Sequence, residues 1–312
     1  MTGLWRAQPV AIKGGKTLPP NCIFASGRQA LQHGMQRLGL SRVNRVAYPE
    51  YSSACVVSCI ARVASPIPFT DVMRFGIKVD TVIIYEQWGW PYTNDVIEQV
   101  LELCQCQIIL DCVDSPDAIK RYGQWLNQPE HHQVQLVISL SKCLGLKAGG
   151  LLYAATGWQN SVIAREPAIV YEADPAKCAD INKTYSNNVE LISPFLDCDI
   201  EAMLSAEAQA RQDRLLWLAN LGVADDWPTW MHAVIEQGKG APGIAPLYAN
   251  ASDSKRLELQ AKLADMGIET AIYNFNFSGH PLKTDYRPCL ALPIHSELPM
   301  GSALAQLLLS IK

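Results

Sequence analysis

Short apolar runs alternate with helical patterns through the first half of the chain. Strand-like runs lie at residues 45–48, 82–85, 107–110, 134–140 and 151–155, and apolar residues recur at helical spacing over 28–38 and 94–103. Strands that alternate with helices are typical of a mainly parallel sheet with crossover helices. The pattern therefore predicts an α/β fold.

The longest helical pattern, residues 199–219, is followed by a change of texture beyond about residue 227. Strands are expected at 244–247, 268–273 and 289–292, with helices at 253–266 and 300–311. These short elements predict a compact α+β unit. We place a domain boundary near residue 235, which divides a large domain (1–235) from a small C-terminal domain (236–312).

The composition is that of a folded protein without a nucleic-acid or membrane partner. The chain has 312 residues, of which 49% are hydrophobic and 18% charged, so it can bury a large core. Its net charge is −4, and Lys and Arg are scattered rather than clustered into a basic face. No apolar stretch approaches the length of a membrane span, and the first residues lack an export pattern. We expect a cytoplasmic protein.

The cysteines and histidines do not predict a metal site. Ten cysteines occur in a long chain without an export signal, so we expect reduced thiols. Cys104 and Cys106 form a C-x-C pair, but no second pair accompanies it at zinc spacing. His131 and His132 are adjacent in a polar segment, as surface-loop histidines are. We predict no bound metal.

Three short segments carry candidate chemistry, and the first is Ser26-Gly27-Arg28, directly before a helical pattern. A hydroxyl, a glycine that allows close backbone approach and the amides of a helix N-terminus form a cradle for a phosphate. The alternative is an ordinary helix cap. The segment alone does not decide between them.

The second and third segments are Asp111, at the end of the strand over 107–110, and Lys142, after the strand over 134–140. A carboxylate at a strand end can be a metal ligand, a general base or the partner of a protonated pyridine nitrogen. A lysine at the mouth of a buried strand can be desolvated and lose its proton, as an imine-forming amine requires, although most lysines are simply solvated. A phosphate cradle, a carboxylate and a lysine, in this order, match the three chemical handles of pyridoxal phosphate (PLP).

With this order in place, the chain resembles the DegT/StrS-type sugar aminotransferases of the aspartate-aminotransferase superfamily. Five stretches and one spacing carry the resemblance: residues 25–31 (ASGRQAL, family SGT-x-AL), 46–51 (V-x-x-P-x-Y), 89–91 (G-x-P), 109–114 (ILDCVD, family I-E-D-x-A-[QH]), Lys142 to Gly149-Gly150 (K…GG) and 292–295 (LPIH). The resemblance covers about two thirds of the chain. It implies a PLP-dependent fold of type I, with a large domain and a smaller C-terminal α+β domain.

The resemblance also implies residue roles. Lys142 would form the Schiff base with PLP and move a proton between the substrate carbon and the cofactor. Asp111 would pair with the ring nitrogen, and Tyr51 would stack on the ring. Asp114 stands where the family has Gln or His near the phenolic oxygen, and Ser53 stands where it has an aromatic residue.

Phosphate contacts are implied in the same way, from Ser26, from the amides of Gly27 and Arg28, and from Ser139 or Ser141. Members of the family are homodimers with shared active sites, in which a neighbouring asparagine contacts the phosphate. Asn187 and Asn188 are the candidates here. We therefore expect a homodimer.

The function implied is transfer of an amino group from glutamate to a nucleotide-linked keto sugar. One alternative is a member of the fold that has lost transamination and acts as a binding or regulatory protein, which Ser53, Asp114 and the short chain favour. Another is a different PLP reaction, by a lyase or an amino-acid aminotransferase, because the cofactor handles are shared across the superfamily. The sequence contains no dinucleotide, P-loop or hydrolase motif.

Overall fold

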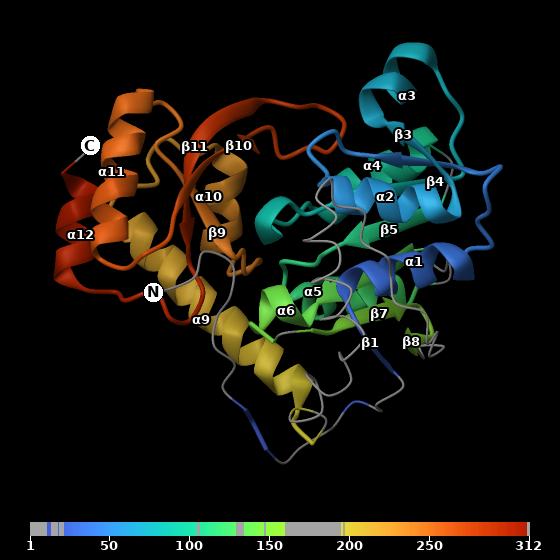
Figure 1. Cartoon of the computed structure of the whole chain (residues 1–312), viewed down its shortest axis with the longest axis horizontal. Coiled ribbons are helices and arrows are strands. Elements are labelled where there is room, and N and C mark those ends of the chain that lie inside the picture. Colours follow the sequence, from blue (N-terminus) through green and yellow to red (C-terminus); the bar gives the residue numbers. More distant parts are fainter. Residues whose placement is uncertain are drawn as a thin grey trace, which may run out of the picture.

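The computed structural model describes residues 11–13, 18, 22–104, 107–128, 134–146, 148–159, 195 and 197–310. Two sheets form the framework, a large one built from the first half of the chain and a small one from the second (Figure 1). Helix α9 (Ile200–Asn220) belongs to both cores, because Met203 packs in the core of the large sheet and Leu218 in that of the small one.

The large sheet is mainly parallel, as predicted. Its strands are β1 (Ile23–Phe24), β2 (Arg45–Tyr48), β3 (Ser65–Pro68), β4 (Thr81–Tyr85), β5 (Gln107–Asp111), β6 (Val134–Ser139), β7 (Gly150–Ala154) and β8 (Gly157–Trp158). They lie in the order β1-β7-β6-β5-β4-β2-β3, with β8 on β7. Strands β2 to β6 pair in parallel, whereas β7 is antiparallel to β6, β1 and β8.

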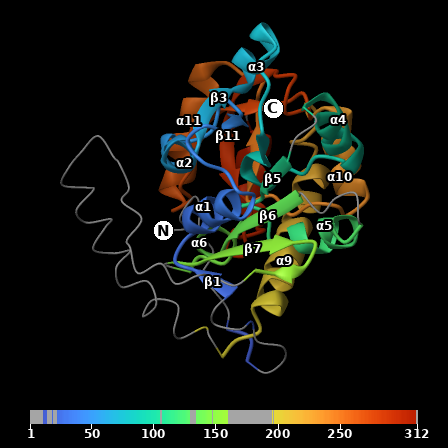
Figure 2. The same ribbon diagram turned by 90° about the vertical axis from the view of Figure 1, so that its right-hand side faces the viewer.

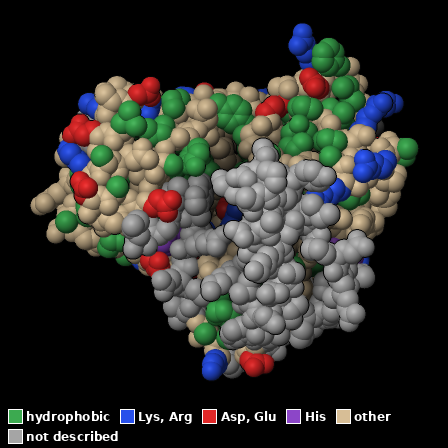
Figure 3. Space-filling model, in the orientation of Figure 1, with side chains coloured by type: hydrophobic (Ala, Val, Ile, Leu, Met, Phe, Trp, Pro, Cys, Tyr) green, Lys and Arg blue, Asp and Glu red, His purple; other side chains and the backbone are tan. Residues whose placement is uncertain are grey.

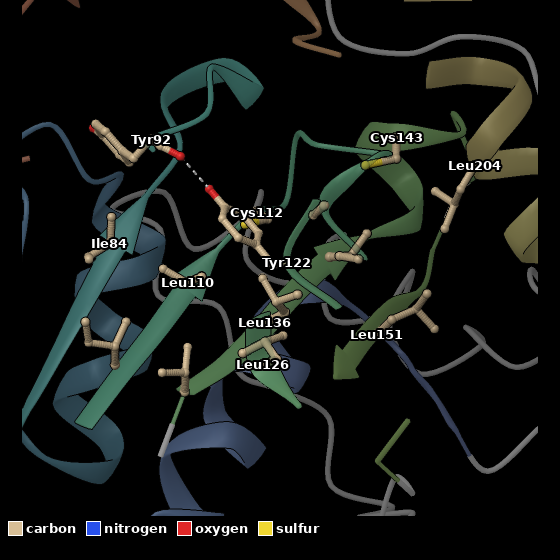
Figure 4. Close-up of a cluster of buried hydrophobic side chains, with 14 of the residues drawn as sticks. Ile84, Tyr92, Leu110, Cys112, Tyr122, Leu126, Leu136, Cys143, Leu151 and Leu204 are labelled. Atoms are coloured by element: carbon tan, nitrogen blue, oxygen red, sulfur yellow. Dashed lines mark hydrogen bonds between the residues drawn. The ribbon is translucent and has the colours of Figure 1, made fainter. Parts of the chain in front are cut away.

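Helices cover both faces of this sheet: α1 (Gly27–Arg37), α2 (Ala54–Val63), α3 (Phe69–Phe75), α4 (Asn94–Cys104), α5 (Ala118–Leu126) and the short α6 (Leu140–Cys143). Figure 2 shows α1 and α5 on opposite sides of β6. Because side chains alternate along a strand, β4, β5 and β6 contribute to two cores, and their near-continuous apolar runs are those of a sheet buried on both faces. Ile84, Leu110 and Leu136 point into one of them (Figure 4).

Helix α1 begins where the sequence predicts because Ser26 caps it. The Ser26 hydroxyl accepts a hydrogen bond from the backbone N–H of Gln29 at 3.2 Å. Gly150 of β7 lies directly against this cap, since a Cβ there would be 2.3 Å from the Ser26 carbonyl oxygen. The glycine therefore fixes how closely the cap approaches the edge of the sheet.

The small sheet consists of β9 (Ile244–Leu247), β10 (Ala271–Asn276) and β11 (Tyr286–Pro293), all antiparallel, in the order β10-β11-β9. Helices α10 (Thr229–Glu236), α11 (Asp253–Asp265) and α12 (Ser302–Leu309) pack with it. The 3-10 turn η2 (Gln87–Gly89) of the large sheet reaches this unit, where Trp88 stacks on Phe275 with ring centroids 5.1 Å apart. The boundary at residue 235 remains a prediction.

The predicted elements are confirmed in type, with one strand displaced. The strand expected at 268–273 is β10, which begins at Ala271 and continues to Asn276. It extends because β11 starts at Tyr286 and pairs with it along its whole length, up to Asn276 opposite Tyr286. Helices α2, α3, α5 and α10 and strand β3 lie in segments for which the sequence pattern gave no prediction.

In the described residues, no group of three or more His, Cys, Asp or Glu side chains is arranged to hold a metal ion. Cys106, His131 and His132 lie outside the described residues. Within the part of the chain that is described, no helix is long and apolar enough to cross a membrane. On the face drawn in Figure 3, Lys and Arg side chains lie apart from one another at several places.

Candidate active site

The candidate residues gather at one edge of the large sheet, where its parallel strands end. Tyr85 is the last residue of β4 and pairs in register with Asp111, the last residue of β5. Asp111 in turn lies opposite Val137 of β6, two residues before that strand ends at Ser139. Strand ends at such an edge are where open α/β sheets build their sites.

The N-terminus of α1 meets the end of β6 at this edge. A Cβ on Gly27 would lie 3.2 Å from Ser139 Cβ and 3.3 Å from Val113 Cγ1, so the helix start, β6 and the loop after Asp111 are in close approach. The Ser139 and Ser141 hydroxyls are 3.0 Å apart. The start of α1, with its positive end, thus lies beside Ser139, and Ser139 beside Ser141. That these groups and Ser26 bind a phosphate remains a prediction.

Asp111 carries an unused hydrogen-bond acceptor. Asp111 is 3% exposed, and its buried Oδ1 atom has no hydrogen-bond partner among the described residues. Burial raises the pKa of this carboxyl from 3.8 to about 7, although the Lys142 ammonium acts in the opposite direction. A buried acceptor without a donor is costly, so this atom suits a ligand that brings an N–H group.

Lys142 projects from the short helix α6 and forms an ion pair with Asp114. The Lys142 Nζ atom is 3.2 Å from Asp114 Oδ2, and the lysine side chain is 42% exposed, compared with 9% for the aspartate. The Lys142 ammonium also lies 5.9 Å from the centre of the Tyr85 ring. The structure thus brings Lys142, Asp111 and Asp114 into one electrostatic unit.

In the site without a ligand, burial does not favour loss of the Lys142 proton overall. Desolvation does act to lower the pKa of Lys142, but the carboxylates of Asp114 and Asp111 raise it more, and the pKa lies above its ordinary value. The family resemblance places Asp114 near the cofactor, but its ion pair with Lys142 was not predicted.

Tyr51 lies next to the site, between other aromatic rings. Its hydroxyl is 3.3 Å from the Tyr85 carbonyl oxygen, to which it donates, and 3.1 Å from the Tyr92 hydroxyl. Its ring centre is 5.9 Å from that of Tyr85 and 5.4 Å from that of Tyr286 in the small sheet. Stacking of Tyr51 on a cofactor remains a prediction. Ser53, exposed at the start of α2, places no ring there.

Arg211 of α9 binds the backbone of the two segments that carry Asp114 and Lys142. Its guanidinium is 2% exposed and pairs with Glu207 at 2.8 Å. It donates to the carbonyl oxygens of Asp114 at 2.8 Å, Lys142 at 3.2 Å and Cys143 at 3.1 Å. One buried side chain therefore fixes the loop of Asp114 relative to the turn of Lys142.

A second buried network anchors the segment after Asp111. Glu86, which follows β4, accepts hydrogen bonds from Ser115 at 2.6 Å, from Tyr122 at 2.5 Å and from both terminal nitrogens of Arg121 at 2.8 and 2.7 Å. Arg121 also pairs with Asp117 at 2.8 Å. These bonds tie α5 and the loop that carries Asp114 to the end of β4.

These features define a site for a ligand with an anionic end, a ring N–H and a carbonyl group within reach of an amine. PLP has all three. The free Oδ1 acceptor of Asp111 and the cradle of Ser26, Gly27, Ser139 and Ser141 fit this cofactor.

Comparison with a family model gives the same class of protein. A family described as "Putative PLP-dependent aminotransferase" matches residues 10–161, just under half of the chain, and this stretch contains Ser26, Asp111 and Lys142. None of the curated proteins compared with the chain matches it.

Solved structures of aminotransferases match nearly the whole chain. A DegT DnrJ EryC1 StrS aminotransferase from Brucella abortus is 16% identical, with a TM-score of 0.54 over 93% of this chain and 84% of that one. DesV of S. venezuelae, in complex with a ketimine intermediate, is 16% identical, with a TM-score of 0.53 over 91% and 82%. NtdA of Bacillus subtilis, with bound cofactor PMP, is 12% identical, with a TM-score of 0.54 over 93% and 72%.

The chain has the fold of the PLP-dependent aminotransferases, so the predicted fold class is confirmed, and so is the resemblance to the DegT/StrS type. The family model indicates a PLP-dependent aminotransferase, with PLP as its cofactor. The roles of individual residues remain predictions. Asn187 and Asn188 lie outside the described residues.

Two residues of the site were not predicted. Tyr85 donates a hydrogen bond to Asp114 Oδ2 at 2.7 Å. Its position at the end of a predicted strand, beside that of Asp111, was a usable signal. Arg211 lies 97 positions from Asp114 within a helix, and nothing in its local sequence distinguishes it from a solvated arginine.

We predict that Asp111→Asn stabilises the cofactor-free protein and removes part of its pH dependence. Asp111 binds its proton more tightly in the folded than in the unfolded state, so stability falls as pH rises from 3.8 to about 7 and is level above that. One pKa unit corresponds to about 1.4 kcal/mol, so the gain at pH 7 should be a few kcal/mol.

Urea unfolding at several pH values measures this effect. Asp213→Asn, on the exposed face of α9, is the control and should change stability by less than about 0.5 kcal/mol. The same Asp111→Asn protein should bind PLP more weakly than wild type. A variant that is neither stabilised at pH 7 nor weakened in PLP binding would contradict this role of Asp111.

We predict that Arg211→Met lowers both stability and PLP affinity. The substitution leaves the buried Glu207 carboxylate without its charged partner and removes the arginine donors from several carbonyl oxygens, which should cost about 3–5 kcal/mol in urea unfolding.

Arg214→Met is the matched control for Arg211→Met. Arg214 lies one turn further along α9 and donates to the carbonyl oxygens of Leu298 and Ser296, away from the site. It should lower stability and leave PLP affinity near the wild-type value. Equal PLP affinity in the two folded variants would show that Arg211 does not position the site.

Proposed function

We propose that this protein is a PLP-dependent aminotransferase that moves an amino group from glutamate to a nucleotide-linked keto sugar. The observation that carries the proposal is the buried, unpaired Oδ1 atom of Asp111 on the same strand edge as Lys142 and the helix-end cradle. The family model and the fold support the aminotransferase class. The donor and the acceptor rest on the family resemblance.

When bound, PLP supplies a carbonyl carbon that takes up amines and a ring that accepts the electron pair released when a C–H bond breaks. Asp111 would keep the ring nitrogen protonated, because its Oδ1 atom accepts an N–H and its charge favours the cation. The cradle of Ser26 and Gly27 would hold the phosphate. Lys142 would attach the cofactor and then carry a proton to and from the substrate carbon.

The homodimer belongs to the same proposal. It is supported by the resemblance to DegT/StrS-type enzymes, in which the neighbouring subunit completes the site. The cytoplasmic location stays a prediction.

The test is the absorbance spectrum of the protein with PLP, followed by borohydride reduction and peptide mapping. Wild type should carry the reduced label on Lys142, and glutamate added beforehand should abolish it by converting the cofactor to its amine form. Lys142→Ala should show no label, because it lacks the attaching amine. Lys239→Ala, which removes an exposed lysine of the small domain, should behave as wild type.

Each other outcome contradicts part of the proposal. A label on Lys142 that no amino donor removes would favour the binding or regulatory alternative. Turnover of free amino acids without a nucleotide sugar would favour another PLP reaction. Absence of label on Lys142 would overturn the cofactor assignment.

A further inference from the structure

Asp114 contacts two groups, the neutral phenol of Tyr85 and the charged ammonium of Lys142. Its Oδ2 atom accepts a hydrogen bond from the Tyr85 hydroxyl at 2.7 Å and lies 3.2 Å from the Lys142 ammonium. Where the resembling family has Gln or His, a neutral side chain would stand beside this lysine. The negative charge beside the attaching amine is therefore a feature of this chain.

Tyr85 keeps the Asp114 carboxylate in its place. Burial, and then the neighbouring Asp114, raise the pKa of Tyr85 well above 10, so the phenol stays neutral and can donate. The phenol oxygen itself accepts the backbone N–H of Trp88 at 3.3 Å. Trp88 has a positive φ of 58°, a strained conformation for this residue, and its ring is fixed against Phe275 of β10.

The other charged or titratable groups around Lys142 come from five elements. Asp111 ends β5, Tyr85 ends β4, Cys55 lies in α2, Cys143 follows the lysine in α6, and Arg211 lies in α9. Arg211 binds the Lys142 carbonyl oxygen, and its charge is already paired with Glu207. Two carboxylates thus act on one ammonium group.

We propose that Asp114 is a positioning residue that holds Lys142 as an ammonium ion until the cofactor enters the site. The inference rests on the proposed function in one respect, that Lys142 is the amine that attaches PLP. An ammonium nitrogen has no electron pair with which to attack a carbonyl carbon. Attachment therefore requires that Lys142 lose one proton, and Asp114 makes this loss harder because its charge stabilises the ammonium form. The Asp114 carboxylate, 3.2 Å away, is within reach to take up that proton when the cofactor enters.

The test measures the reactivity of Lys142 in the cofactor-free protein. Acetic anhydride acylates only neutral amines, so the extent of labelling against pH, read by peptide mass spectrometry, gives a midpoint for each lysine. Asp114→Asn keeps the shape of the side chain and removes its charge. The Lys142 midpoint should move to lower pH than in wild type, while that of Lys262, paired with Glu258 on the surface of α11, should not move.

Two further measurements keep the result interpretable. Tyr85→Phe removes the hydrogen bond to Asp114 and leaves both charges, so its Lys142 midpoint should not fall. In wild type, the Lys142 midpoint should lie above that of the same lysine in urea-unfolded protein, a comparison that needs no substitution. An unchanged or higher midpoint in folded Asp114→Asn, or a wild-type midpoint at or below the unfolded value, would overturn the proposal.

Failure of the proposed function would be seen separately. The acylation profile uses no cofactor, whereas the borohydride label does. A lowered midpoint in Asp114→Asn together with no PLP on Lys142 would support the ion-pair role and overturn the cofactor assignment. A PLP label on Lys142 with no change of midpoint in Asp114→Asn would support the cofactor assignment and overturn the ion-pair role.

Discussion

The arrangement of the site depends on the buried guanidinium of Arg211. Three carbonyl oxygens converge on it, one from the loop at Asp114 and two from Lys142 and Cys143 of α6. A fourth, from Ala241 at 3.4 Å, comes from the segment that leads into the small sheet. Backbone carbonyls buried behind an active site need donors, and an arginine offers several in a rigid fork. The distance between the lysine turn and the carboxylate loop follows from this one residue.

The charged Asp111 carboxylate of the site lowers the stability of the folded protein. Asp111 is buried with a pKa of about 7 and an unpaired oxygen, and Asp114 shares one ammonium with it. A ligand with a protonated ring nitrogen would offset this cost, because that ligand supplies the missing donor and the missing positive charge.

Much of the fold and part of the candidate site could be predicted from the sequence. The apolar runs of β4, β5 and β6 are nearly continuous and buried on both faces, so strand type and the mainly parallel sheet were readable. Ser26, Asp111 and Lys142 each stand at the end of a strand or the start of a helix, where local pattern and position carry information. Contacts across long sequence separations were not readable. Neither the Arg211 carbonyl bonds nor the bond of Gln87 to β10, 187 positions away, leaves a local trace. The ion pair of Lys142 with Asp114, 28 positions earlier, was not predicted either, although the resemblance placed both residues near the cofactor.

If the proposed function is right, Lys142 and Asp111 hold one molecule of PLP between them, and a crystal structure of the protein grown with PLP would show it. We expect electron density continuous with Lys142 Nζ, the ring nitrogen within hydrogen-bond distance of Asp111 Oδ1, and the phosphate at the start of α1. PLP bound elsewhere, or bound here with Asp111 Oδ1 still unpaired, would contradict it.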